Sequence, residues 1–95
     1  MLVTIGIARC SGSGIRIEVQ KPQSSARAEK TYSDVQAARA ALCNFGLPHE
    51  AVDYFLRLTA DLEPNQVLTF PPTDVPYHHL IGEDFHIANA VGGLP

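Results

Sequence analysis

Apolar and β-branched residues alternate with small or polar ones in two segments near the start of the chain, residues 2–10 and 15–21. Positions 11–14 between them read Ser-Gly-Ser-Gly, a composition typical of turns. Two short β-type segments on either side of such a turn predict a β-hairpin over residues 2–21.

The register of this hairpin follows from the burial of its apolar residues. A loop with an odd number of residues places both apolar rows on one face, whereas a slip of one residue sends one row to the opposite face. An odd loop is therefore expected, with Gly14 as the left-handed residue that closes it. The shared apolar face then consists of Val3, Ile5, Ile7, Ile15, Ile17 and Val19. The opposite face carries Gly6 and Ala8, and what covers that face is left open.

Two helices are predicted in the middle of the chain. Residues 22–30 mix small and charged side chains and are read as a loop. Ser33 and Gln36 then fit a capping box for a helix that runs to about residue 45, where Gly46 suits a left-handed C-terminal cap. The inward stripe of this helix is expected to be Val35, Ala38, Leu42 and Phe45.

The second helix begins near Pro48, whose missing N–H is tolerated in a first turn, and Glu50 lies favourably near the helix N-terminus. It is expected to continue to about residue 62. Its inward residues are predicted to be Val52, Phe55, Leu58 or Thr59, and Leu62.

The last third of the chain gives a weaker pattern. Residues 66–70 predict a strand that Pro71 and Pro72 end, and residues 73–76 predict a loop. Residues 77–81 fit a fourth strand, residues 85–91 fit a strand or a short helix, and residues 92–95 fit a tail. The order β-β-α-α-β predicts an α+β fold, with a two-helix hairpin on one face of a small antiparallel or mixed sheet. Residues 1–91 are expected to form a single domain, because 95 residues cannot fill two cores.

Composition narrows the classes of partner. The chain is 45% apolar and only 18% charged, so part of its apolar surface is expected to meet a protein partner, a second copy included. The net charge of −3 disfavours nucleic acid and anionic membranes, which basic surfaces bind. The first five residues contain no basic leader, and no apolar run approaches the ~18 residues of a membrane span. A cytoplasmic protein with reduced thiols and no cofactor is expected, and a small ligand is not excluded.

One cluster suggests metal chemistry. His78, His79, Asp84 and His86 fall within nine positions, with Glu83 among them, and imidazole and carboxylate suit zinc or other divalent ions. The spacing matches no established ligand pattern. The alternative interpretation is a polar loop and strand edge.

Other motifs are explained by structure alone. Cys10 or Cys43 would need an activated thiolate beside a distant histidine to act as a nucleophile, and Cys43 is more simply a packing residue. Gly12 and Gly14 precede a strand rather than the helix that a phosphate loop requires. No catalytic residue is therefore assigned.

The stretch Phe-Gly-Leu-Pro at positions 45–48, with a helix on each side, resembles a helix-turn-helix and also the helix–loop–helix of ubiquitin-associated domains. The second helix presents His49, Glu50 and Asp53, which disfavour DNA phosphates. The ubiquitin-associated fold needs a third helix that the predicted order does not supply. A plain helical hairpin explains the same residues.

Two features favour protein interaction. Residues 68–76 combine apolar side chains with three prolines, and a stiff apolar segment loses little entropy on binding. Its interaction candidates are Leu68, Phe70, Pro71, Pro72, Val75 and Pro76. The edge of the first strand, guarded only by Arg9, is a second candidate. The preferred hypothesis is a non-enzymatic domain that binds a protein or forms a homodimer, and the alternative is a divalent-metal site at the histidine cluster.

Overall fold

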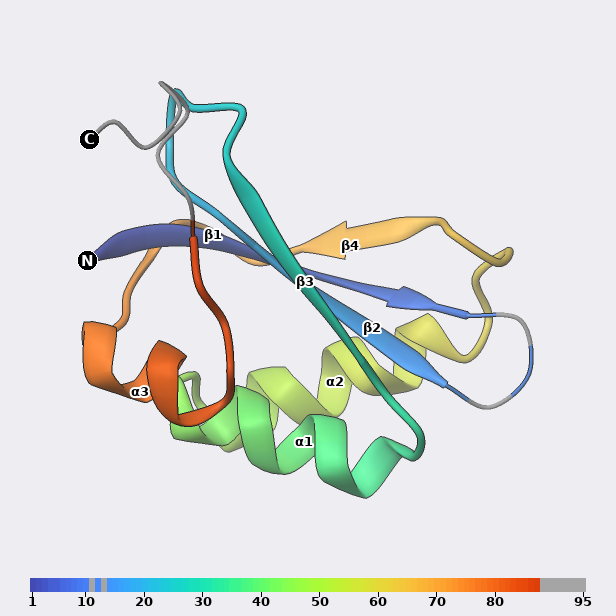
Figure 1. The fold of residues 1–95 in the computed structure, drawn as a ribbon. Helices are drawn as coiled ribbons and strands as arrows, with labels where there is room; N and C mark the ends of the chain where they lie inside the picture. Colours follow the sequence, from blue (N-terminus) through green and yellow to red (C-terminus); the bar gives the residue numbers. More distant parts are fainter. Residues whose placement is uncertain (11, 13, 88–95) are drawn as a thin grey trace.

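The structure is a computed structural model that describes residues 1–10, 12 and 14–87. These residues form an antiparallel sheet of five strands in the order β3-β2-β1-β4, with β5 also beside β1. Three helices lie on one side of this sheet, as Figure 1 shows. The α+β class with a two-helix hairpin on the sheet is therefore confirmed.

The hairpin has the predicted register. β1 (Leu2–Arg9) pairs with β2 (Ile15–Gln20) so that Ile7 lies opposite Ile17. The Cys10 N–H donates to the Gly14 carbonyl oxygen at 3.0 Å, which closes a loop with an odd number of residues. The prediction of Gly14 as the left-handed residue is wrong. Gly12 at the middle of the loop has a φ of +89°, a conformation that glycine adopts without steric cost.

The loop predicted over residues 22–30 is wrong in its second half, where β3 (Arg27–Tyr32) pairs with β2. Its inward positions hold Ala28, Lys30 and Tyr32, none of them strongly apolar, so the alternation that marks a strand was hidden. Lys30 is partly exposed, and its Nζ donates to the backbone oxygen of Glu83 at 3.1 Å.

The first helix, α1 (Val35–Asn44), begins one residue later than the capping box predicts. Asp34 is the N-cap, and its carboxylate accepts from the Ala37 N–H at 2.8 Å. Val35 is 43% exposed instead of inward, because the first turn extends beyond the packed part of the helix. The rest of the predicted stripe is buried, and Gly46 takes the expected left-handed conformation with φ +92°.

The second helix, α2 (His49–Thr59), ends three residues before the predicted residue 62. Its buried residues are Val52, Leu56 and Thr59. The remaining predicted inward residues are only partly covered: Phe55 and Leu62 are half-buried, and Leu58 is 36% exposed. Arg39 of α1 joins the two helices through an ion pair to Asp53, with Nε and Oδ1 2.6 Å apart.

The C-terminal part differs most from prediction. β4 (Val67–Thr69) is the expected third strand, but residues 73–76 contain β5 (Thr73–Asp74) in place of a loop. Residues 77–81 fall in a helix, α3 (Tyr77–Gly82), and the strand predicted there is wrong. Pro76 directly precedes the helix, and Leu80 is the buried residue of α3. The segment therefore buries one side chain per helical turn, not every second side chain as a strand would. The tail prediction at 92–95 and part of the element at 85–91 lie outside the described residues.

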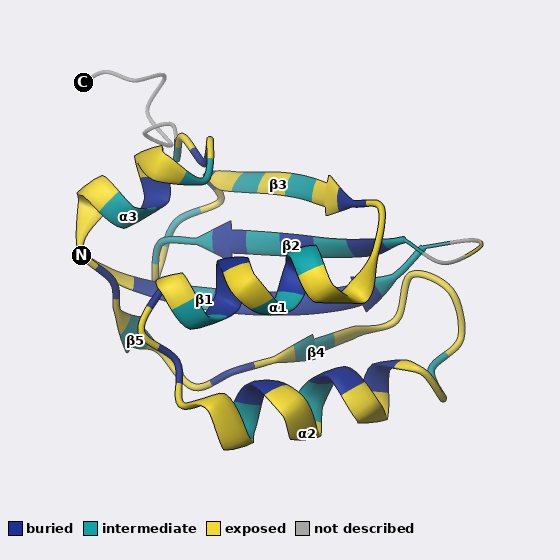
Figure 2. Cartoon of the chain, turned by 90° about the horizontal axis from the view of Figure 1, so that it is seen from below, coloured by how far each residue is buried: buried dark blue, intermediate teal, exposed yellow. Residues whose placement is uncertain are grey.

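The core lies between the sheet and the helices, and the burial colours of Figure 2 show it from the helical side. All six residues of the predicted apolar hairpin face are buried. Phe55 of α2 stacks on Phe70, with ring centroids 4.1 Å apart. Phe45, at the end of α1, meets Phe85 edge to face, with ring centroids 5.4 Å apart. This second contact packs the chain after α3 against the end of α1.

Candidate functional site

The structure does not bring the four predicted metal ligands together. His78 and His79 are adjacent in α3, with ring centroids 4.4 Å apart and planes at 74°. Asp84 is exposed and its carboxylate lies 3.5 Å from Lys30, whereas His86 is exposed beyond the buried Phe85. Over residues 1–10, 12 and 14–87, no group of three or more His, Cys, Asp or Glu residues is close enough to hold a metal ion. The geometry gives the metal hypothesis no support.

Two of those histidines instead line a pocket of about 460 Å³ between α3 and the end of α1. We call it the α1–α3 pocket. Its lining residues are Cys43, Asn44, Gly46, His78, His79, Gly82 and Glu83. Sequence reasoning missed this association because α1 and α3 are far apart in the chain and no local pattern indicates that they are neighbours.

Glu83 organises the inner wall of the pocket. Its Oε1 accepts from the Tyr32 hydroxyl at 3.2 Å, and its Oε2 accepts from Nδ2 of Asn44 at 2.9 Å. Burial, and then the negative charge of Glu83, raise the pKa of Tyr32 well above its usual range. Tyr32 therefore remains a neutral donor that anchors the carboxylate.

The nitrogen Nδ1 of His79 is buried and has no hydrogen-bond partner. A buried polar atom without a partner is costly to the folded state. Cys43 is a half-buried free thiol on the same pocket. The pocket thus combines a carboxylate, an imidazole and a thiol.

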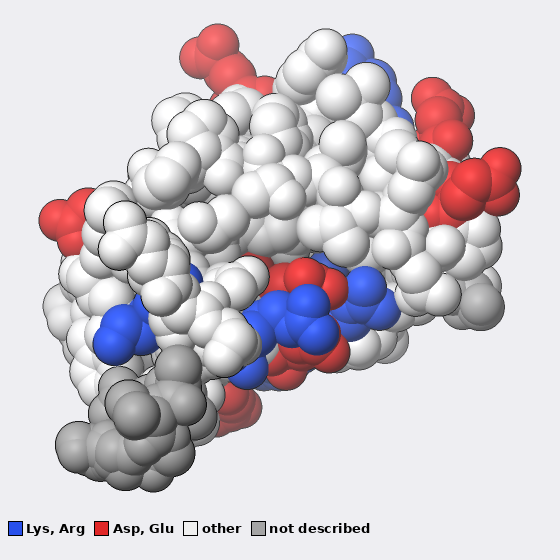
Figure 3. Space-filling view, turned by 90° about the horizontal axis from the view of Figure 1, so that it is seen from above, with Lys and Arg blue, Asp and Glu red and all other residues white. Residues whose placement is uncertain are grey.

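A second candidate region is the face of the sheet opposite the helices. Within the described residues no helix packs on it, which answers the question left open for the Gly6 and Ala8 face. Figure 3 shows a band of charged side chains along one side of this face and a broad area without charge beside it.

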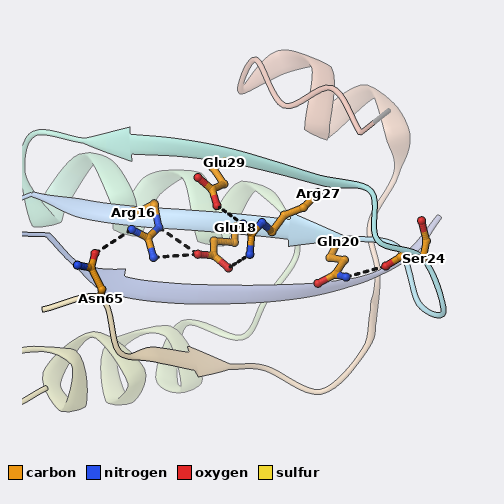
Figure 4. A network of polar contacts seen from close by, with 7 residues as sticks. All are labelled: Arg16, Glu18, Gln20, Ser24, Arg27, Glu29 and Asn65. Atoms are coloured by element: carbon orange, nitrogen blue, oxygen red, sulfur yellow. Dashed lines mark hydrogen bonds and ion pairs between the residues drawn. The ribbon is translucent and has the colours of Figure 1, made fainter. Parts of the chain in front are cut away.

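The charged band is a ladder of ion pairs on β2 and β3, drawn in Figure 4. Arg16 Nη2 lies 3.0 Å from Glu18 Oε2, and Arg27 Nη2 lies 3.0 Å from Glu29 Oε2. Arg27 also reaches Glu18 at 3.6 Å, which connects the two pairs. Asn65 accepts from Arg16 at 3.1 Å and ties the loop before β4 to the ladder. We call these two arginines and two glutamates the charge ladder.

The uncharged part of the face lies over β1 and β4. Gly6 and Ala8 are buried although no helix in the described part of the chain covers them, because neighbouring side chains lean over them. A β-carbon on Gly6 would lie 2.8 Å from Cγ1 of Val67. Val67 itself is 41% exposed, and Leu2 at the far end of β1 is 52% exposed.

The interaction residues predicted in residues 68–76 divide into two groups. Phe70 and Val75 are buried in the core, and Leu68 is half-buried. Pro71, Pro72 and Pro76 are exposed. The exposed part of this segment therefore mixes prolines with Thr69 and Asp74 and is not a continuous apolar strip.

The predicted free edge of the first strand is wrong, because β1 is central and pairs on both sides. The sheet ends instead at β3 and at β4 with β5. Lys30 points inward on β3, and Pro71 and Pro72 interrupt the short strands on the other side. Inward charge, prolines and short strands all discourage pairing with another chain.

No helix among the described residues combines the length and the apolar character needed to cross a bilayer. Comparison of the chain with profiles of known protein families, with curated protein sequences and with solved structures gave no match.

Proposed function

We propose that this chain is a non-enzymatic domain that forms a homodimer through the helix-free face of its sheet. The observation that carries the proposal is the state of that face: no helix of the described residues covers it, it exposes Val67 and Leu2, and the charges of its ladder are paired with one another. A sheet with one apolar-lined open face commonly gains stability by packing that face on a second sheet.

Charge favours a second copy on this face over other surfaces. The two arginines and two glutamates of the charge ladder cancel, so the net charge of −3 resides elsewhere on the chain. Two copies that approach through their neutral faces keep their net negative charge apart. The ladder also enters the interface with its ion pairs already formed, which lowers the desolvation cost.

The edges offer a poorer route. Pairing along β3 would have to accommodate Lys30, and pairing along β4 and β5 would meet Pro71 and Pro72. The open face has no such obstacle.

The size of the face sets the expected affinity. Four strands ~4.8 Å apart, with about six residues of ~3.3 Å each, span roughly 19 by 20 Å. Such a face buries less than the ~800 Å² per partner of a standard interface. A dissociation constant in the micromolar range, on the order of 10 μM, is therefore expected.

Analytical ultracentrifugation between ~1 and ~100 μM tests the proposal, because this range brackets micromolar dissociation constants. The weight-average mass should rise from that of a monomer of 10.3 kDa towards twice that value. A constant monomer mass up to ~100 μM would refute self-association at specific affinity.

A further inference from the structure

We propose that the α1–α3 pocket binds a small organic cation, an amine whose ammonium group is held by Glu83. This inference does not depend on self-association, because the pocket is lined by residues of α1, of α3 and of the turns that follow them, and these helices lie on the side of the sheet away from the open face (Figure 2). It rests on the acceptor-rich lining of the pocket, on its electrostatic surroundings and on its volume.

The Glu83 carboxylate has room for further donors. Each of its oxygens holds one donor, Tyr32 or Asn44, and a carboxylate oxygen can accept two hydrogen bonds. An ammonium group carries three N–H donors, so it can bond to the remaining carboxylate lone pairs.

The surroundings favour positive charge. Asn44 is the last residue of α1, and the C-terminal end of a helix carries partial negative charge. The pocket lining contains no Lys or Arg. Lys30 Nζ donates to the backbone oxygen of Glu83 at 3.1 Å and pairs with the carboxylate of Asp84, and among the described residues no ion pair involves the Glu83 carboxylate.

A divalent metal fits less well, because within the described parts of the chain no three ligating side chains converge. The volume of about 460 Å³ lies in the range of small-molecule pockets. An amine can be a free metabolite or a lysine side chain of another protein. Both sources share the ammonium group, and the first probe below is therefore a free diamine.

The direct test is a ¹H–¹⁵N NMR titration of the intact chain with 1,4-diaminobutane, with 1,4-butanediol as the neutral probe of equal length. The diamine should shift the resonances of residues 43–46 and 78–83, and the diol should not. Glu83→Gln should weaken diamine binding at least fivefold. Asp84→Asn removes an adjacent exposed carboxylate outside the pocket and should change binding less than twofold.

Equal binding of the diol, or unchanged binding in Glu83→Gln, would overturn the proposal. Zn²⁺ at an equimolar dose that shifts the same resonances and displaces the diamine would also overturn it, in favour of a metal site. N-α-acetyl-lysine methylamide in a parallel titration distinguishes the two sources. Binding tighter than that of the diamine supports a lysine side chain as the natural ligand, and weaker binding supports a free amine.

Cys43 allows a second test that does not rely on Glu83→Gln folding normally. Cystamine and bis(2-hydroxyethyl) disulfide differ in the charge of the group they attach. The Cys43 thiolate attacks one sulfur of the reagent, the reagent S–S bond breaks, and one small thiol leaves as a mixed disulfide forms. Cys10, a half-buried thiol outside the pocket, is the internal control.

Under exchange equilibrium with both disulfides in excess over a small amount of 2-mercaptoethanol, mass spectrometry gives the ratio of cationic to neutral adduct at each cysteine. The ratio at Cys43 should exceed the ratio at Cys10 at least threefold. Equal ratios at the two cysteines would contradict a cation-selective pocket. In Asp84→Asn the difference between the two ratios should persist.

Discussion

Gly6 of β1 and Val67 of the adjacent strand β4 lie side by side on the open face of the sheet, and a β-carbon at position 6 would lie 2.8 Å from Cγ1 of Val67. Real β-carbons do not tolerate such a distance, so Val67 or the edge strand that carries it must move. Gly6→Ala is expected to cost about 1–3 kcal/mol of stability, the usual range for overpacking. Urea denaturation of the variant measures this cost.

Val67→Ala removes the atom that would collide. In that background Gly6→Ala should cost close to nothing, or stabilise by about 0.5 kcal/mol because alanine has less freedom than glycine in the unfolded chain. A Gly6→Ala cost that is the same with and without Val67 would mean that Gly6 is required for another reason.

The helix cap offers a second prediction with a built-in control. Asp34 accepts from the Ala37 N–H at 2.8 Å, whereas Ser33 makes no side-chain hydrogen bond to the described residues. Asp34→Ala should destabilise the protein by about 1 kcal/mol, and Ser33→Ala by less than about 0.5 kcal/mol. Thermal unfolding of the two variants compares them. A larger loss of stability in Ser33→Ala than in Asp34→Ala would instead support Ser33 as the N-cap, as the capping-box pattern predicts.

This one-residue difference illustrates what sequence can and cannot predict. The hairpin register was predictable because Ile5, Ile7 and Ile17 leave one arrangement that buries them all. The cap was ambiguous, since Ser33 and Asp34 are both good caps and only the position of the helix decides between them. β3 was missed because Lys30 and Ala28 face the core side without a strong apolar signal.

The candidate pocket was predictable only in part. The sequence indicates the histidines as a cluster. In the predicted strand His78 and His79 would face opposite sides, whereas in the helix α3 both line the same pocket. Their partners Cys43 and Asn44 come from α1, and tertiary packing alone brings them close. The left-handed Asp84, with φ +66°, turns the chain so that Phe85 packs on Phe45 and Glu83 meets Asn44.

Tyr32 gives a pH-dependent prediction. Its pKa is raised in the folded protein, first by burial and then by Glu83, whereas the unfolded chain releases the same proton near the ordinary value of about 10.0. The folded state therefore binds this proton more tightly. The resulting stabilisation is complete below pH 10 and is lost progressively as the pH rises above it.

Tyr32→Phe removes both the hydrogen bond to Glu83 and this titration. The wild type should exceed the variant in stability by about 0.5–1.5 kcal/mol at pH 8, the ordinary net value of one hydrogen bond. That advantage should shrink at pH 11, because the unfolded wild type then releases the Tyr32 proton. Lysine titration is common to both proteins and cancels in the comparison. Urea denaturation at both pH values measures this difference in stability. An advantage that stays constant would mean that the pKa of Tyr32 does not differ between the folded and unfolded states.

Val67 and Val35 form a matched pair for testing the proposed dimer. They are 41% and 43% exposed, but Val67 lies on the open face and Val35 lies in the first turn of α1. At ~100 μM, well above a micromolar dissociation constant, Val67→Asp should be monomeric, because a carboxylate would be buried without a partner. Val35→Asp should dimerise as the wild type does. Dissociation of both variants, or of neither, would argue against the open face as the interface.

Salt gives the last prediction about the same interface. If the charge ladder enters the dimer already paired, few new ion pairs form between the copies, and the main long-range term is repulsion between two chains of net charge −3. Salt screens that repulsion, so the dissociation constant should fall as NaCl increases from ~20 to ~200 mM, which shortens the Debye length by about a factor of three. A dissociation constant that rises instead would mean that ion pairs between the copies hold the dimer. In that case Arg16 and Glu18 would have to exchange partners across the two-fold axis.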